Sequence, residues 1–177
     1  CGELMVGRVG LGLAGVALLG LLLVYSAPPL RWNERGLGEV VEAVGVGAML
    51  PWFNAYAQSG QVAPIELLLV LPGTAALALA SAIASGLADE ESDRAGAKVT
   101  ITTELGNAGA RSAVEHSVMA GAVMWALAAR AGVGWLSPFG FSAALAVLMW
   151  QWREVAAASP YALTNAFPAI ARYKQAL

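Results

Sequence analysis

Long runs without a formal charge constrain this chain more than any other feature. Residues 9–30 and residues 67–88 each form a run of 22 residues without Asp, Glu, Lys or Arg. A helix needs roughly 20 mostly apolar residues to cross the hydrocarbon core of a bilayer. Only 12% of the chain is charged, whereas soluble domains have about 25% charged residues. The sequence therefore predicts an integral membrane protein.

Hydropathy predicts five to six helical spans. Further apolar runs cover residues 43–65, 110–130, 131–152 and 155–171, and the last is broken by Pro160 and Pro168. Residues 58–61 are predicted to form a turn, and residues 101–109 a loop before a helix that begins near Ala110. We therefore expect a single all-α domain over residues 1–177, a polytopic transmembrane helix bundle.

Most charged residues lie in two connections between the apolar runs. Residues 31–42 contain two arginines, and the later connection adds Arg94, Lys98 and Arg111. Loops rich in Lys and Arg stay on the cytoplasmic side, so we expect both connections on that side, where they can line one mouth. We expect a multi-pass protein of a bacterial inner membrane with its acidic loop in the cytoplasm. A net charge of −2 without a basic cluster argues against nucleic acid as a partner.

Residues 89–100, Asp-Glu-Glu-Ser-Asp-Arg-Ala-Gly-Ala-Lys-Val-Thr, are an island of charge in this apolar chain. Asp89 and Asp93 are four residues apart, so one helical turn places both carboxylates on the same face. Such a pair suits Mg²⁺, which prefers oxygen ligands and also binds substrate phosphate. Arg94 and Lys98 have the same spacing and can bind phosphate oxygens. From charge spacing alone, a solvated acidic loop is the simpler interpretation.

Four elements in a fixed order carry a family resemblance. They are Tyr-Ser-Ala-Pro-Pro-Leu-Arg at residues 25–31, Arg-Gly-Leu-Gly-Glu at residues 35–39, the island, and Leu-Gly at residues 105–106. Together they resemble the UbiA superfamily of intramembrane prenyltransferases. The second element looks most like the menaquinone-pathway branch, which prenylates dihydroxynaphthoate. Residues 26–30 and Leu-Pro-Trp at residues 50–52 are also similar to chlorophyll synthases.

The resemblance implies a nine-helix bundle around a cavity that opens to the cytoplasm, and this chain looks like its C-terminal part. It implies Mg²⁺-dependent transfer of a polyprenyl group from its diphosphate to an aromatic quinone precursor such as dihydroxynaphthoate. Metal and basic side chains stabilise the departing diphosphate in that chemistry. By this resemblance Asp89 and Asp93 hold the metal. The residues expected to bind the diphosphate and the substrate head group are Arg94, Lys98, Arg31, Tyr25 and Ser26.

Two further residues are candidates for contact with the acceptor substrate. Glu39 is predicted near a helix start together with Glu42, where acidic side chains also simply favour the helix dipole. Asn54 lies in an apolar run, where an interhelical hydrogen bond explains it, although a polar residue within a span is also a pocket candidate. Both alternatives stay open for each residue.

The chain departs from the family pattern at the first Asp-rich motif, because no Asp precedes Asp89. A lone half-site would hold Mg²⁺ and diphosphate weakly. The chain is then a fragment of an enzyme, which a start at Cys1 fits, one half of a split enzyme, or a degenerate relative. The last would be a non-catalytic transmembrane subunit that packs in a larger membrane complex and binds lipid, quinone or pigment. The enzyme is the leading hypothesis.

Overall fold

The computed structural model describes residues 9–133 and residue 146, and the elements in this part of the chain are all helical. The all-α class is therefore confirmed for the described residues, whereas the apolar runs at 131–152 and 155–171 lie almost wholly outside them. The helices in chain order are α2 (Val9–Ser26), a 3-10 turn (Trp32–Glu34), α3 (Gly38–Val44), a π-helical turn (Gly45–Met49), α4 (Leu50–Ser59), α5 (Ile65–Gly86), α6 (Glu90–Ala95) and α7 (Ile101–Arg130).

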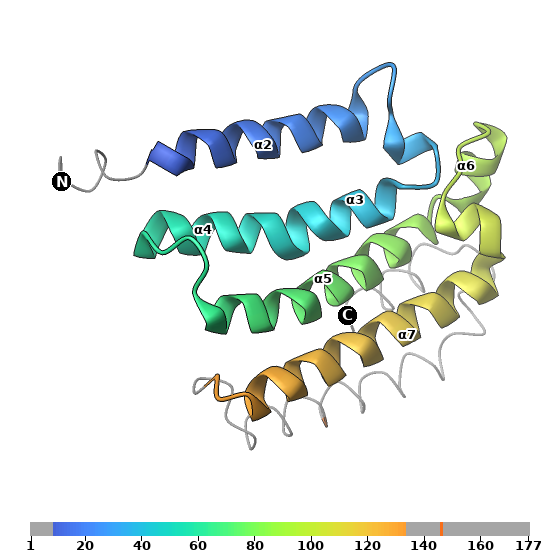
Figure 1. The fold of residues 1–177 in the computed structure, drawn as a ribbon. Coiled ribbons are helices and arrows are strands. Elements are labelled where there is room, and N and C mark those ends of the chain that lie inside the picture. The colour runs from blue at the N-terminus through green and yellow to red at the C-terminus, as the bar shows by residue number, and fades with distance from the viewer. Residues whose placement is uncertain (1–8, 134–145, 147–177) are drawn as a thin grey trace.

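The long helices lie beside one another in chain order (Figure 1). α2 packs along the stretch from α3 to α4, that stretch packs on α5, and α5 packs most extensively on α7. Helices joined by short connections become antiparallel neighbours. The α2–α3 connection and α6 consequently lie at the same end of the molecule (Figure 1), as the sequence predicts.

α5 is the one helix in the described part of the chain that is long and apolar enough to cross a bilayer. α2 contributes a shorter apolar helix, Gly10–Ser26. Its outward side chains include Leu13 and Val16, which are 73% and 66% exposed. The multi-pass arrangement stays a prediction.

Small residues bring the central helices close together. Ala80, Ile83 and Ala84 of α5 form a buried cluster with Ala110 and Val114 of α7, and small side chains permit such close packing of helices in membranes.

The π-helical turn shows the same close approach on the other face of α5. A Cβ atom at Gly47 would lie 2.6 Å from the Cα atom of Ala75, so only glycine fits there. Thr74 donates a hydrogen bond from Oγ1 to the carbonyl oxygen of Gly47. α3–α4 and α5 therefore meet backbone to backbone at this point.

The predicted turn is confirmed and the predicted loop is wrong. α4 ends at Ser59, and Gly60 follows with a left-handed φ of 75°. α7 begins at Ile101 rather than near Ala110, because Thr100 and Thr103 form a capping box that starts the helix. The helix is interrupted only at Gly106, whose φ and ψ are 69° and 169°.

Candidate functional site

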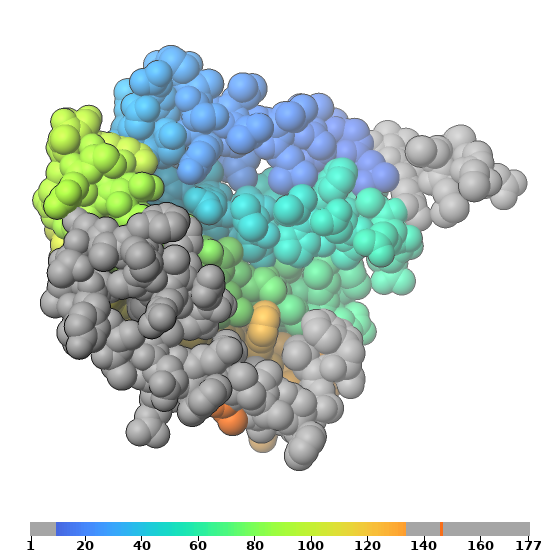
Figure 2. All heavy atoms as spheres, turned by 180° about the vertical axis from the view of Figure 1, so that it is seen from behind, coloured from blue at the N-terminus to red at the C-terminus, as the bar shows by residue number. Residues whose placement is uncertain are grey.

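The two charged connections are joined by backbone hydrogen bonds. Val99 donates its N–H to the carbonyl oxygen of Glu34 (3.0 Å), and Gly36 donates to the carbonyl oxygen of Val99 (2.8 Å). Gly36 has a φ of +84°, and a Cβ atom there would lie 3.1 Å from Cγ1 of Val99, so glycine suits both the backbone conformation and the contact. Figure 2 shows the atoms of the α6 segment in yellow-green against the light-blue α2–α3 connection.

The acidic island folds into the short helix α6 and a turn. Asp89 precedes the helix, and the N–H of Asp93 donates to its carbonyl oxygen (2.8 Å), so the two aspartates are one helical turn apart. The chain then turns back, and Lys98 donates its backbone N–H to the carbonyl oxygen of Asp93 (2.9 Å). The side chains of these two residues form an ion pair with Nζ and Oδ2 3.3 Å apart.

A polar cavity of about 420 Å³ opens where the connections meet. Its lining includes two acidic and two basic side chains, so their formal charges cancel. A diphosphate, which is multiply negative, would gain little net attraction there without an added cation. The lining residues of this polar cavity are Glu34, Arg35, Ser92, Asp93, Gly96, Ala97 and Lys98.

Mg²⁺ fits this end of the molecule only as an ion shared with a substrate. No group of three or more His, Cys, Asp or Glu side chains gathers in the part of the chain that is described. Mg²⁺ is commonly held by one or two carboxylates together with waters and substrate phosphates. Asp89 is exposed and, within residues 9–133, makes no ion pair, while Asp93 is paired with Lys98. These two carboxylates are the donors that the resemblance assigns to the ion, and Glu34 adds a further carboxylate to the lining of the polar cavity.

Of the three basic residues that the sequence assigns to the diphosphate, Lys98 alone lines the polar cavity. Arg94 instead pairs with Glu90 on α6 (3.2 Å). Arg31 pairs with Glu34 (3.3 Å), which in turn lines the cavity.

Sequence reasoning did not select Arg35, which lines the cavity and makes no ion pair within the described ranges. The signal was present in the Arg-Gly-Leu-Gly-Glu element. Gly36 turns the chain at this point, and the backbone pairing of the two connections holds Arg35 opposite Val99.

An apolar groove of about 670 Å³ runs between α2 and the α3–α4 stretch. This volume is typical of sites for small molecules, which span roughly 300–1,000 Å³. Tyr25, a predicted substrate residue, is in its lining, whereas the exposed Ser26 donates Oγ–H to the carbonyl oxygen of Leu22 (2.9 Å) on its own helix. The lining residues of the apolar groove are Leu18, Leu21, Leu22, Tyr25, Val41, Glu42, Gly45, Val46 and Leu50.

The two remaining candidates lie apart from both cavities. Glu39 is buried, with 6% of its surface exposed, and its Oε1 accepts a hydrogen bond from the N–H of Ile101 (2.8 Å). Asn54 is exposed on α4, which extends towards the end of the molecule opposite α6 (Figure 1). Neither residue lines the polar cavity or the apolar groove.

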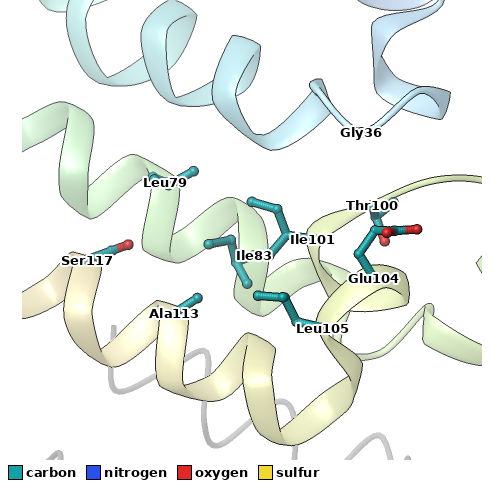
Figure 3. Close-up of a pocket in the computed structure, with 9 residues that line it drawn as sticks. All are labelled: Gly36, Leu79, Ile83, Thr100, Ile101, Glu104, Leu105, Ala113 and Ser117. Carbon is teal, nitrogen blue, oxygen red and sulfur yellow. The ribbon is translucent and has the colours of Figure 1, made fainter.

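The Leu-Gly element of the resemblance lies at a third, smaller pocket of about 350 Å³. Ile83 of α5 converges there with Ile101 and Leu105 of α7, beside the interruption at Gly106 (Figure 3). Gly36 also lines this pocket, so the bend in α7 adjoins the connection that carries Arg35.

Comparison with known proteins identifies the family. A model of the UbiA prenyltransferase family matches residues 1–172. No curated protein and no solved structure gives a match. The match covers nearly the whole chain, and members of this family are membrane-integral prenyltransferases. The chain belongs to the UbiA prenyltransferase family.

Proposed function

We propose that the chain binds a polyprenyl diphosphate together with Mg²⁺ and transfers the polyprenyl group to an aromatic acceptor such as dihydroxynaphthoate. Family membership supports prenyl transfer in general. The observation that carries the proposal is the polar cavity, where Asp93, Lys98 and Arg35 meet from two distant connections. Asp89, one helical turn from Asp93, supplies a second carboxylate.

Lys98, Arg35 and the two aspartates each have a definable part in such a reaction. The bond between the allylic carbon and the diphosphate oxygen breaks, the oxygen keeps the electron pair, and an aromatic carbon of the acceptor bonds to the allylic carbon and loses a proton. Lys98 and Arg35 bind the negative charge that develops on the diphosphate. Asp89 and Asp93 would hold Mg²⁺, which would supply further positive charge when bound.

The apolar groove suits the hydrocarbon part of the substrate. All of its lining residues except Glu42 are apolar or aromatic, and burial of hydrocarbon provides non-directional affinity. The groove includes Tyr25, which lies just before the connection that supplies Arg35. We propose that both cavities face the cytoplasm in a multi-pass protein of a bacterial inner membrane, since the basic residues of both connections lie at that end.

A second function is favoured by the Lys98–Asp93 ion pair, which already neutralises one proposed metal ligand. The chain would then be a non-catalytic transmembrane subunit derived from this family. It would pack in a larger membrane complex and bind lipid, quinone or pigment in the apolar groove.

Binding of farnesyl thiodiphosphate, a poorly reactive analogue, tests the proposal on the purified chain in detergent. We expect binding that requires Mg²⁺ and that weakens by roughly tenfold or more in the double variant Asp89→Ala, Asp93→Ala, equivalent to losing about 1.5 kcal/mol of charge-assisted contacts. Glu91→Ala removes another exposed carboxylate of α6 and should bind normally. Binding that EDTA leaves unchanged contradicts the metal site. Absence of binding by the folded chain would show that this chain alone does not form the diphosphate site.

A further inference from the structure

Glu39 connects two elements that are 62 residues apart in the sequence. It lies in the first turn of α3, and its Oε1 accepts the N–H of Ile101, the first residue of α7. The first N–H groups of a helix have no partner within the helix, and a carboxylate is favourable beside them. The other oxygen, Oε2, is buried without a hydrogen-bond partner among the described residues. The contact with Ile101 therefore holds this carboxylate in place.

The capping box of α7 leaves the N–H of Ile101 for Glu39. Thr103 donates its N–H to Oγ1 of Thr100 (3.1 Å), and Thr100 donates its N–H to Oγ1 of Thr103 (2.8 Å). The two threonines thus satisfy the backbone groups on either side of Ile101. Glu39 supplies the acceptor that α7 itself lacks at this position.

The Glu39 contact belongs to a short series that fastens one connection to the other. The other two members are the backbone hydrogen bonds of Val99 with Glu34 and Gly36. The Glu39 contact is the member that uses a side chain, so a substitution can remove it and leave the two backbone hydrogen bonds with their donors and acceptors. Lys98 immediately precedes Val99, and Arg35 lies between Glu34 and Gly36. The series therefore sets the position of Lys98 relative to Arg35.

We propose that Glu39 is a positioning residue that holds the α6–α7 turn against the α2–α3 connection and thereby shapes the polar cavity. Glu39 lines neither the polar cavity nor the apolar groove, so it acts through Ile101 and the adjoining backbone. Its effect on the cavity walls stands by itself. Its effect on diphosphate binding rests on the proposed function.

Two substitutions of Glu39 separate the hydrogen bond from the charge. Glu39→Gln keeps an accepting oxygen, and Glu39→Leu has a similar size without an acceptor. Ile101→Pro removes the N–H that Glu39 accepts, because proline has no backbone N–H. The fold should accept this change, since proline is tolerated at the first position of a helix and Thr100 already has the extended backbone that a following proline requires (φ −137°, ψ 164°). This third variant provides a test should Glu39→Leu fail to fold.

Hydrogen exchange and spin-label distances measure the position of the turn without a ligand. Labels at Leu37→Cys and Glu91→Cys, in a Cys1→Ser background, report the separation of the connection and α6. We expect Glu39→Leu and Ile101→Pro to broaden this distance distribution and to speed exchange over residues 93–103 by roughly tenfold. Exchange over residues 76–84 of α5 should not change. Glu39→Gln should match the parent protein, and so should Glu66→Leu, which removes an exposed carboxylate from the first turn of α5.

The outcomes separate this proposal from the proposed function. Unchanged distances and exchange in folded Glu39→Leu or Ile101→Pro would overturn the positioning role. Loss of protection in Glu39→Gln as well would show that the charge, rather than the hydrogen bond, holds the turn, and would also overturn it as stated. Loosening without any Mg²⁺-dependent binding of farnesyl thiodiphosphate in the parent chain would support the positioning role and count against the prenyl-transfer function alone.

Discussion

The α5–α7 interface and the polar end of the molecule, where the α2–α3 connection meets the α6 segment, are held together by different forces. Ile83 and Val114 are among the fully buried side chains of the interface, which contains mainly Ala, Val, Ile and Leu. The polar end depends on three hydrogen bonds, the two backbone bonds of Val99 and the bond between Glu39 and Ile101. It also contains ion pairs whose side chains are 13% to 52% exposed.

We expect the two regions to contribute differently to the stability of the fold and to ligand binding. Packing depends on side-chain volume, so the interface responds strongly to the loss of buried atoms. Exposed ion pairs contribute little to folding because water and salt screen them. The charges of the polar end are therefore free to serve binding, while the interface provides the rigid support.

Truncating the interface should give the largest effect. Ile83→Ala leaves a cavity in the α5–α7 cluster, and we expect the free energy of unfolding to fall by about 2–5 kcal/mol. Denaturant unfolding in detergent micelles measures this change. Leu13→Ala removes a side chain that is 73% exposed on α2 and should have little effect. An equal loss in both variants would contradict the distinction between buried and outward-facing apolar residues.

Removing the cap of α7 should have an intermediate effect. Thr100→Val deletes the hydroxyl that accepts the N–H of Thr103, and we expect about 1 kcal/mol of destabilisation. Hydrogen exchange should accelerate first in residues 101–105. Ser85→Ala, which removes a hydroxyl bonded within its own helix to the Ser81 carbonyl oxygen, is the control. Faster exchange along the whole of α7 would show that the cap and the interface unfold together.

Removing the ion pair between Lys98 and Asp93 should give the smallest effect, and the change in affinity should have opposite signs for two ligands. Lys98→Met frees the Asp93 carboxylate, so Mg²⁺ alone should bind up to about fivefold more tightly, in line with the 0.2–1 kcal/mol of a partly exposed ion pair. Binding of farnesyl thiodiphosphate with Mg²⁺ should weaken, because a cation that contacts the diphosphate is lost.

Titration calorimetry with each ligand distinguishes these two signs. Arg94→Met is the matched control, since it frees Glu90 on α6 away from the polar cavity. If Lys98→Met weakens both ligands, Lys98 does not compete with Mg²⁺ for Asp93.

Local patterns in the sequence predicted much of the fold and part of the site. Uncharged runs located α2 and α5 closely, and the Asp89–Asp93 spacing correctly placed the two residues one helical turn apart. The helical start at Ile101 was missed, because Thr100, Thr102 and Thr103 give the segment a polar composition that resembles a loop. Their hydroxyls instead cap or pack within the fold.

Meetings between charged side chains of the two connections could not be predicted in the same way. The Arg94–Glu90 pair lies within one helix and has the four-residue spacing that periodicity relates. Arg35 enters the polar cavity through a contact between connections that are far apart in the sequence. Helical periodicity relates residues within three or four positions, so it carries no information on such a meeting.

The sequence by itself determined that the described chain forms apolar helices with its charges gathered in two connections, because hydrophobicity and helix periodicity act locally. Tertiary structure decided which of these charges share a cavity and which carboxylate supports another helix. Glu39 shows the distinction most clearly, since its neighbours in the sequence suggest a helix start or an acceptor contact. Its hydrogen bond to Ile101 exists only because packing of α3 and α7 against α5 brings Oε1 of Glu39 to 2.8 Å from the backbone nitrogen of Ile101.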